Sequence, residues 1–181
     1  MPIYISMLRG INVSGQKLIK MDALKNLYES LGFEEVNTYV QSGNVVFKSG
    51  ERDTAFLARD LAAKIKEVFA FDVDVIVKTM DEYQSIVDQN PLVNDSDKDL
   101  SSMYVTFLSS IPEKVDLKAL ESKRQGDEVV EFFNEVIYLY CPGGYGKTKL
   151  TNNFFESKLK VVATTRNWKT VSALLEIALR K

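Results

Sequence analysis

Two stretches near the C-terminal end of the chain carry residue types that could bind or transform a ligand. The first, Cys141–Thr148, fits the phosphate-binding pattern G-x-x-x-x-G-K-[ST] except that Cys141 replaces the first glycine. Backbone N–H groups and a helix N-terminus face the phosphate in such loops, which makes Lys147, Thr148 and Lys149 candidate anion ligands. The antiparallel hairpins predicted below argue against nucleotide hydrolysis, which this motif normally performs on a parallel sheet. A turn built from glycines explains the pattern equally well.

The second stretch runs from Thr164 to Thr170 and contains the only tryptophan of the chain. One interpretation is that Arg166, Trp168 and Lys169 form a phosphate-binding and base-stacking surface together with the lysines of the first stretch. In the other interpretation, Thr165 or Asn167 caps the final helix and Trp168 packs on the core without any ligand.

Charge is distributed unevenly along the sequence. Residues 147–181 contain eight basic and two acidic side chains, a net charge of +6, whereas residues 71–135 contain 15 acidic and six basic side chains. The basic C-terminal segment would attract a polyanion such as nucleic acid, and the acidic middle would repel it.

Composition excludes several classes of site. The chain has no histidine and a single cysteine, so disulfide frameworks, Cys/His zinc sites, iron–sulfur clusters and imidazole catalysis are ruled out. Asp95, Asp97 and Asp99 begin like a calcium loop, but Leu100 replaces the glycine that such a loop needs. We therefore expect no metal and no cofactor, and we interpret Cys141 as a packing residue at a strand end.

No signal peptide and no apolar run of about 20 residues is present, so we expect a cytoplasmic protein that does not enter the membrane.

Hydrophobic periodicity predicts the same order of elements twice. In the first half, alternating and 3.6-residue patterns predict strands at 3–8, 36–40, 45–47 and 73–78, with helices at 21–31 and 57–68. Thr79 and Glu82 form a capping box that predicts a short helix through Val87. The second half predicts strands at 103–108, 128–133, 136–141 and 161–163, helices at 112–123 and 150–159, and a final helix along 171–178.

Two successive βαββαβ units are typical of ferredoxin-like α/β plaits. The sequence therefore predicts an α+β protein made of two ferredoxin-like subdomains with antiparallel sheets and an extra C-terminal helix. We place the first subdomain and a connector helix at residues 1–96, and the second with the C-terminal helix at residues 97–181.

Four motifs resemble the uncharacterised bacterial domain-of-unknown-function family 1697: Met7–Val13, Tyr39–Asn44, Gly144–Leu150 and Ala163–Trp168. The resemblance extends over nearly the whole chain, with Ser14-Gly15 where the family more usually has two glycines. It implies a duplicated ferredoxin-like fold in a small cytoplasmic protein, and it implies no activity. The family's motif positions fall on Arg9, Asn12, Gln41, Ser42, Asn44, Tyr145, Lys147, Arg166, Asn167 and Trp168.

These observations lead to three functional hypotheses. The first is a protein that binds an anionic ligand, such as a nucleotide or nucleic acid, through its glycine-containing loops and basic C-terminal segment. The second is an enzyme that holds a phosphorylated or carboxylated metabolite with Arg9, Lys147 or Arg166, while a tyrosine or carboxylate transfers a proton. The third is a scaffold that meets a protein partner or a second copy through its plait faces or edge strands. The sequence sets no oligomeric state.

Overall fold

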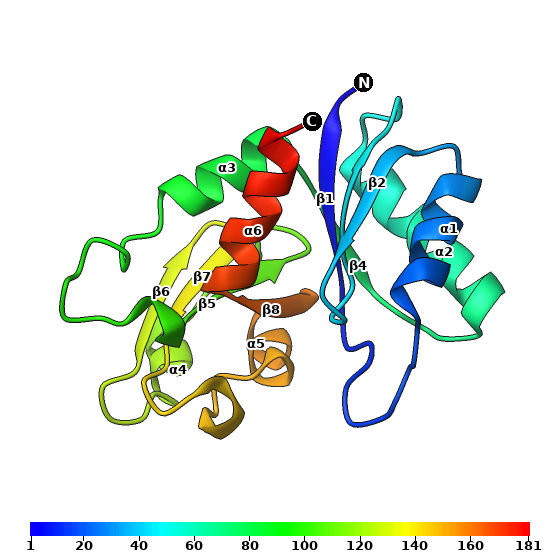
Figure 1. Cartoon of the computed structure of the whole chain (residues 1–181). Helices are drawn as coiled ribbons and strands as arrows, with labels where there is room; N and C mark the ends of the chain where they lie inside the picture. The colour runs from blue at the N-terminus through cyan, green and yellow to red at the C-terminus, as the bar shows by residue number, and fades with distance from the viewer. The chain divides into compact units, whose positions relative to one another are not determined.

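The computed structural model describes residues 1–181, and the chain divides into two units. The first unit comprises residues 1–85 and 173–181, and the second unit comprises residues 86–172. The elements, most of which are labelled in Figure 1, are β1 (Ile3–Leu8), α1 (Met21–Ser30), β2 (Glu34–Tyr39), β3 (Asn44–Lys48), α2 (Thr54–Phe69), β4 (Val75–Thr79), α3 (Met80–Asp88), the 3-10 helix η1 (Leu100–Ser102), β5 (Met103–Leu108), α4 (Leu117–Glu121), β6 (Val129–Phe133), β7 (Val136–Tyr140), the 3-10 helix η2 (Tyr145–Lys147), α5 (Asn152–Leu159), β8 (Ala163–Asn167) and α6 (Trp168–Leu179). None of the helices combines the length and hydropathy that spanning a membrane requires.

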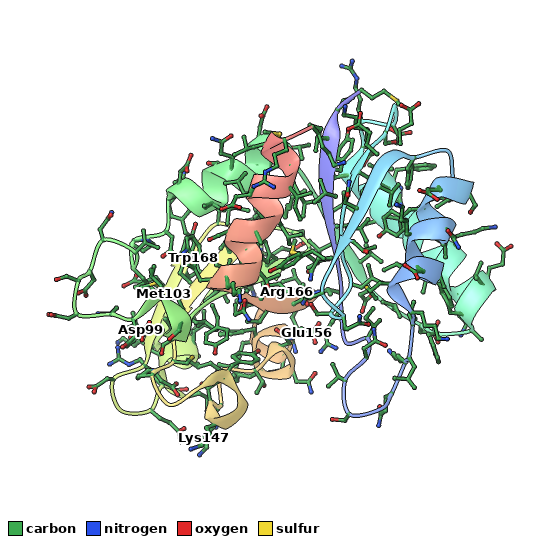
Figure 2. The ribbon with its side chains drawn as sticks, in the orientation of Figure 1. Asp99, Met103, Lys147, Glu156, Arg166 and Trp168 are labelled. Carbon is green, nitrogen blue, oxygen red and sulfur yellow. The ribbon has the colours of Figure 1, made fainter.

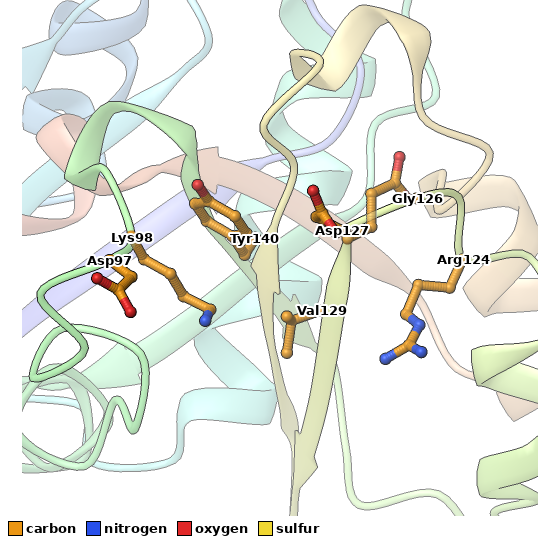
Figure 3. A pocket seen from close by; sticks show the side chains of 8 residues that line it. Asp97, Lys98, Arg124, Gly126, Asp127, Val129 and Tyr140 are labelled. Carbon is orange, nitrogen blue, oxygen red and sulfur yellow. The ribbon is translucent and has the colours of Figure 1, made fainter.

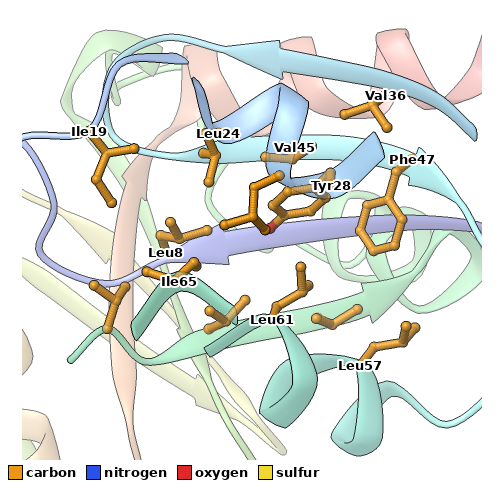
Figure 4. Close-up of a cluster of buried hydrophobic side chains, with 14 of the residues drawn as sticks. Leu8, Ile19, Leu24, Tyr28, Val36, Val45, Phe47, Leu57, Leu61 and Ile65 are labelled. Atoms are coloured by element: carbon orange, nitrogen blue, oxygen red, sulfur yellow. The ribbon is translucent and has the colours of Figure 1, made fainter. Parts of the chain in front are cut away.

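The first unit contains an antiparallel sheet with strand order β2-β3-β1-β4. Its core forms where Leu24 and Tyr28 of α1 and the apolar residues of α2 meet one face of the sheet (Figure 4). The Tyr28 ring lies edge-on to Phe47 at 5.3 Å, and its hydroxyl is 2.8 Å from the Ser6 hydroxyl. Apolar residues at helical spacing thus cover apolar residues at strand spacing.

The second unit repeats this plan with strand order β6-β7-β5-β8. Leu108, Ile137 and Leu139 of the sheet form a buried cluster with Phe155 and Leu159 of α5. Counted from the first strand of each unit, both sheets have the order 2-3-1-4. The predicted α+β fold, with two ferredoxin-like βαββαβ plaits and a C-terminal helix, is confirmed. The division at residues 96 and 97 stays a prediction about where the repeat begins.

Local signals place several element ends. Many predicted ranges differ from the structure by one to three residues at an end, and three differences are larger or concern the candidate site. The capping box is present, because Thr79 N donates to Glu82 Oε2 at 2.8 Å and Glu82 N donates to Thr79 Oγ1 at 3.2 Å. The helix predicted at 112–123 is only Leu117–Glu121, since the Asp116 carboxylate accepts from Ala119 N and caps the helix there.

The other two corrections concern the candidate site. The helix predicted from residue 150 begins at Asn152, because the Thr151 hydroxyl caps it by accepting from Phe154 N. The strand predicted at 161–163 is β8, Ala163–Asn167, which pairs with β5 along its length. Thr164 to Asn167 therefore belong to a sheet rather than to a loop that precedes the final helix.

Candidate functional site

A pocket of about 430 Å³ lies in the second unit, where β8 leads into α6 and η1 leads into β5. Its lining residues come from η1, β5 and the β8–α6 junction: Leu100, Ser101, Tyr104, Asn167, Trp168 and Lys169. Lys169 is the only charged residue among them. Two aromatic side chains, Tyr104 and Trp168, and one cation, Lys169, thus line the same cavity.

Local geometry explains how these side chains come to the pocket. Tyr104 of β5 pairs directly with Asn167 of β8, so the strand ends beside the tyrosine. The Asn167 Oδ1 then accepts a hydrogen bond from Thr170 N at 2.8 Å, which caps the first turn of α6. This cap turns the chain from strand into helix and places Trp168 and Lys169 in the first helical turn. The predicted capping role of Asn167 is confirmed.

Tyr145 does not line the pocket but contacts Tyr104, which does. The Tyr145 ring packs on the Tyr104 ring with centroids 5.1 Å apart and planes tilted by 31°. Tyr145 is partly buried against the core of the second unit. The structure therefore brings the Gly144–Leu150 motif and the Ala163–Trp168 motif to one place through an aromatic contact.

The remaining residues of the phosphate-loop pattern are arranged differently from a phosphate cradle. Lys147 and Lys149 are exposed, and Figure 2 shows Lys147 on the η2 turn. Thr148 is buried, and its hydroxyl donates to Glu128 Oε2 at 3.0 Å and accepts from Leu150 N. Because α5 begins only at Asn152, the helix N-terminus does not adjoin the lysine and threonine.

Cys141 is fully buried at the end of β7. Burial raises the pKa of its thiol to about 11, and the nearby Glu128 carboxylate contributes in the same direction. A thiol with such a pKa stays protonated at neutral pH and is a poor nucleophile, which agrees with the predicted packing role.

Arg166 does not line the pocket. It is buried, and its Nη1 donates to Thr164 Oγ1 at 2.7 Å and to the Thr165 carbonyl at 3.1 Å. Its pairing partner on β5 is Val105, next to Tyr104. Since successive strand residues point to opposite faces of a sheet, Arg166 and Asn167 face different sides.

The predicted residues of the first unit form a hydrogen-bonded cluster between two loops. The Asn12 amide donates to the carbonyls of Ile19 and Gln41, at 2.9 and 2.7 Å, and its Oδ1 accepts from Ile19 N. Asn44 is fully buried and donates to Ser42 Oγ at 2.8 Å and to the Tyr39 carbonyl. These contacts join the loop after β1 to the β2–β3 turn.

Arg9 is partly buried, and its backbone N–H donates to the Asp74 carbonyl. None of the first-unit candidates, Arg9, Asn12, Gln41, Ser42 and Asn44, is among the lining residues of the pocket described above. The hydrogen bonds of Asn12 and Asn44 hold the loop after β1 and the β2–β3 turn together.

Another pocket of the second unit, of about 420 Å³, has charged walls of both signs. In Figure 3, Lys98 and Tyr140 lie on one side of it and Arg124 on the other, with Val129 between them. Lys98 is already engaged, because its ammonium lies 2.6 Å from Asp95 Oδ2 and 5.4 Å from the centre of the Tyr140 ring. Because Asp97, Asp127 and Glu128 line the pocket together with Lys98 and Arg124, its walls carry no excess of positive charge. We assign no ligand to this pocket.

Two lining residues of the pocket, Leu100 and Tyr104, belong to none of the motifs that the sequence shows. Tyr104 looks like any aromatic residue of a strand, and its partner Tyr145 lies far away along the chain. In the sequence, Leu100 is only a leucine shortly before a predicted strand. Its 51 % exposure is visible in the structure alone. A search for aromatic residues within the strand predicted at 103–108 could have found Tyr104.

Comparison with known proteins adds the family and the fold. A family model described as "Protein of unknown function (DUF1697)" matches residues 1–138. This range contains two of the four motifs named above and ends before the residues from Tyr145 to Lys169. None of the curated proteins compared with the chain matches it.

The solved structure of the conserved bacterial protein SP0830 from Streptococcus pneumoniae is similar to this structure. The TM-score is 0.73 at 24 % sequence identity, and the match covers 98 % of each chain. A likeness at this identity concerns the fold, and it extends through both units.

Proposed function

This chain belongs to the DUF1697 family of proteins of unknown function, and we propose that it is a binding protein whose ligand is an anion with a planar group, such as a nucleotide. The binding site is the pocket of the second unit at the β8–α6 junction. The observation that carries the proposal is that the only tryptophan lines one pocket with Tyr104 and Lys169.

The side chains of the pocket suit such a ligand. A nucleobase that stacks on an aromatic side chain contributes about 1–3 kcal/mol to binding. Lys169 supplies a mobile positive charge for a phosphate group. The Asn167 amide nitrogen keeps its donors available for a polar edge of the ligand, because the cap of α6 uses only Oδ1.

The lining carries stacking and charged groups, which suit binding, and it contains no carboxylate, thiol or imidazole. Tyr104 and Lys169 are the lining groups that a turnover reaction could use for proton transfer. The exposed Lys147 and Lys149, on the chain that follows Tyr145, add positive charge near the aromatic support of the pocket. They would strengthen the attraction of a longer anion in a manner that salt weakens.

The proposal is tested by following Trp168 emission while adenosine monophosphate, adenosine triphosphate or a short single-stranded oligonucleotide is added. We expect a saturable change, since the indole is the stacking surface and the chain has no other tryptophan. Affinity should fall between about 50 and 200 mM salt. Lys169→Gln should weaken binding by about three- to tenfold, which corresponds to losing one hydrogen bond worth about 0.5–1.5 kcal/mol.

Lys123→Gln is the matched control, because Lys123 is exposed in the same unit and does not line the pocket. Equal affinities of the Lys169 variant, the Lys123 variant and the unmodified protein would contradict the proposal. Emission that does not respond to any of the three anions would contradict it as well.

A further inference from the structure

A different pocket of the second unit, of about 600 Å³, lies where the chain that follows β5 meets the end of α5. Lys114, Lys158 and Lys160 line it, together with the apolar residues Ile111, Leu159 and Val161. None of these residues belongs to the four motifs or to the pocket of the proposed function. We refer to this cavity as the lysine pocket.

The three ammonium groups of the lysine pocket have no carboxylate partner. All three lysines are exposed and form no ion pair, unlike Lys98, whose ammonium lies 2.6 Å from a carboxylate oxygen of Asp95. Glu113 is the only acidic residue that lines the cavity, so its walls carry a net positive charge. Like charges around one cavity repel each other, and an anion bound there would reduce this repulsion.

The lysines come from two segments of the chain. Lys158 and Lys160 lie at the C-terminal end of α5, where a positive charge stabilises the helix dipole. Lys114 comes from the segment between β5 and α4, which lines the same cavity. A bound anion would therefore meet positive charges from both segments.

Apolar side chains adjoin the positive charges. Leu159 is buried and Val161 is partly buried, and both pack with the core of the second unit. Ile111 is 65 % exposed at the same cavity. A ligand with an apolar body beside its charge would cover Ile111.

We propose that the lysine pocket binds a small amphiphilic anion, which is an organic molecule with a phosphate, sulfonate or carboxylate group attached to an apolar body. The lysines contact the anionic group, and Ile111, Leu159 and Val161 contact the body. The same chemistry occurs in a free metabolite and in a lipid headgroup with its adjoining chain. This site is separate from the pocket at the β8–α6 junction, with which it shares no lining residue.

Anilinonaphthalene sulfonate is a suitable probe, because it joins an aromatic body to a sulfonate and fluoresces when bound. We expect saturable binding to the whole chain that octyl phosphate displaces at lower concentration than inorganic phosphate. Salt should weaken the binding. If inorganic phosphate displaces the probe as well as octyl phosphate does, the apolar part of the proposal is wrong.

Lys160→Gly is the decisive variant. Lys160 has φ +58°, a left-handed conformation that glycine adopts without strain, so the substitution removes one charge and keeps the fold. We expect the affinity for the probe to fall by about fivefold or more, the effect of losing one charge-assisted contact. Lys123→Gln is again the control, since it removes one exposed charge elsewhere in the unit. Equal probe affinities in the two variants would overturn the proposal.

Vesicles distinguish the two sources of the ligand. Sedimentation with phosphatidylcholine vesicles that contain phosphatidic acid, lost in Lys160→Gly, supports a lipid headgroup. Displacement of the probe by octyl phosphate without sedimentation supports a free metabolite. Because the Trp168 assay uses another pocket, Lys160→Gly should leave nucleotide binding unchanged, so the two proposals can fail independently.

Discussion

Replacing Gly43 by alanine tests whether the turn between β2 and β3 requires a glycine for packing. Gly43 has φ +83°, and a Cβ atom there would lie 2.7 Å from Ile11 Cδ1 and 2.9 Å from Leu8 Cβ. The turn approaches β1 this closely because Leu8 N donates to the Gly43 carbonyl at 2.9 Å. Alanine therefore meets both backbone strain and a steric clash.

The two costs can be estimated separately. A non-glycine residue in the left-handed region costs about 1–2 kcal/mol. Forcing an extra methyl group into a packed site costs about 1–3 kcal/mol. We expect Gly43→Ala to lower the free energy of unfolding by about 2–5 kcal/mol, measured by urea denaturation followed by circular dichroism.

Gly32→Ala is the matched control. Gly32 has nearly the same φ, +80°, but a Cβ atom there would meet no atom within 4 Å. It should lose only the strain contribution of about 1–2 kcal/mol. If the two variants lose equal stability, the steric argument is refuted, and the glycine of this motif must be explained by something other than packing.

Three further outcomes follow from the contacts described above. Asn12→Gly keeps the backbone at φ +55° without strain but removes the side chain that joins two loops, and it should cost about 1–3 kcal/mol in a urea titration. The hydrogen bond from Lys48 lowers the pKa of Glu35, so this pair stabilises the fold above the ordinary pKa of 4.5, and the contribution is lost as the pH falls through the lowered value. Glu35→Gln should therefore lower the melting temperature at pH 7 and leave it unchanged at pH 2, and an equal effect at both would contradict this. Cys141 should not react with Ellman's reagent at pH 8 until the protein is unfolded, because burial raises its pKa to about 11, and rapid labelling of the native protein would show that the thiol is accessible.

Element order was predictable because its signals are local. Alternation along Ile3–Leu8 and the spacing of Leu57, Leu61 and Ile65 each depend on neighbouring residues of one element. The helix predicted at 112–123 was too long because Pro112 suits a first helical turn, whereas Asp116 is the residue that caps the observed helix. Pro112 and Asp116 are both residues that can start a helix, and the sequence pattern does not show which of them does.

The candidate site was predictable only in part. The motif residues Tyr145, Asn167 and Trp168 were identified, and the structure places them at or behind one pocket. Arg166 was grouped with them on the assumption that it lies in a loop. It lies in a strand instead, and its partners there are Thr164 and Thr165.

By itself, the sequence determined the two βαββαβ repeats and the absence of histidine chemistry, because periodicity depends on neighbouring residues and composition on no contact at all. The sequence offered Thr165 or Asn167 as the cap of α6, and the structure selects Asn167. Only the tertiary structure decided that Tyr104 joins Trp168 at a pocket and that Arg166 does not. The pairing register of β5 with β8 sets which face each side chain takes, and that register depends on contacts between segments far apart in the chain. The same reason applies to the lysine pocket, whose three cations come from two separate segments.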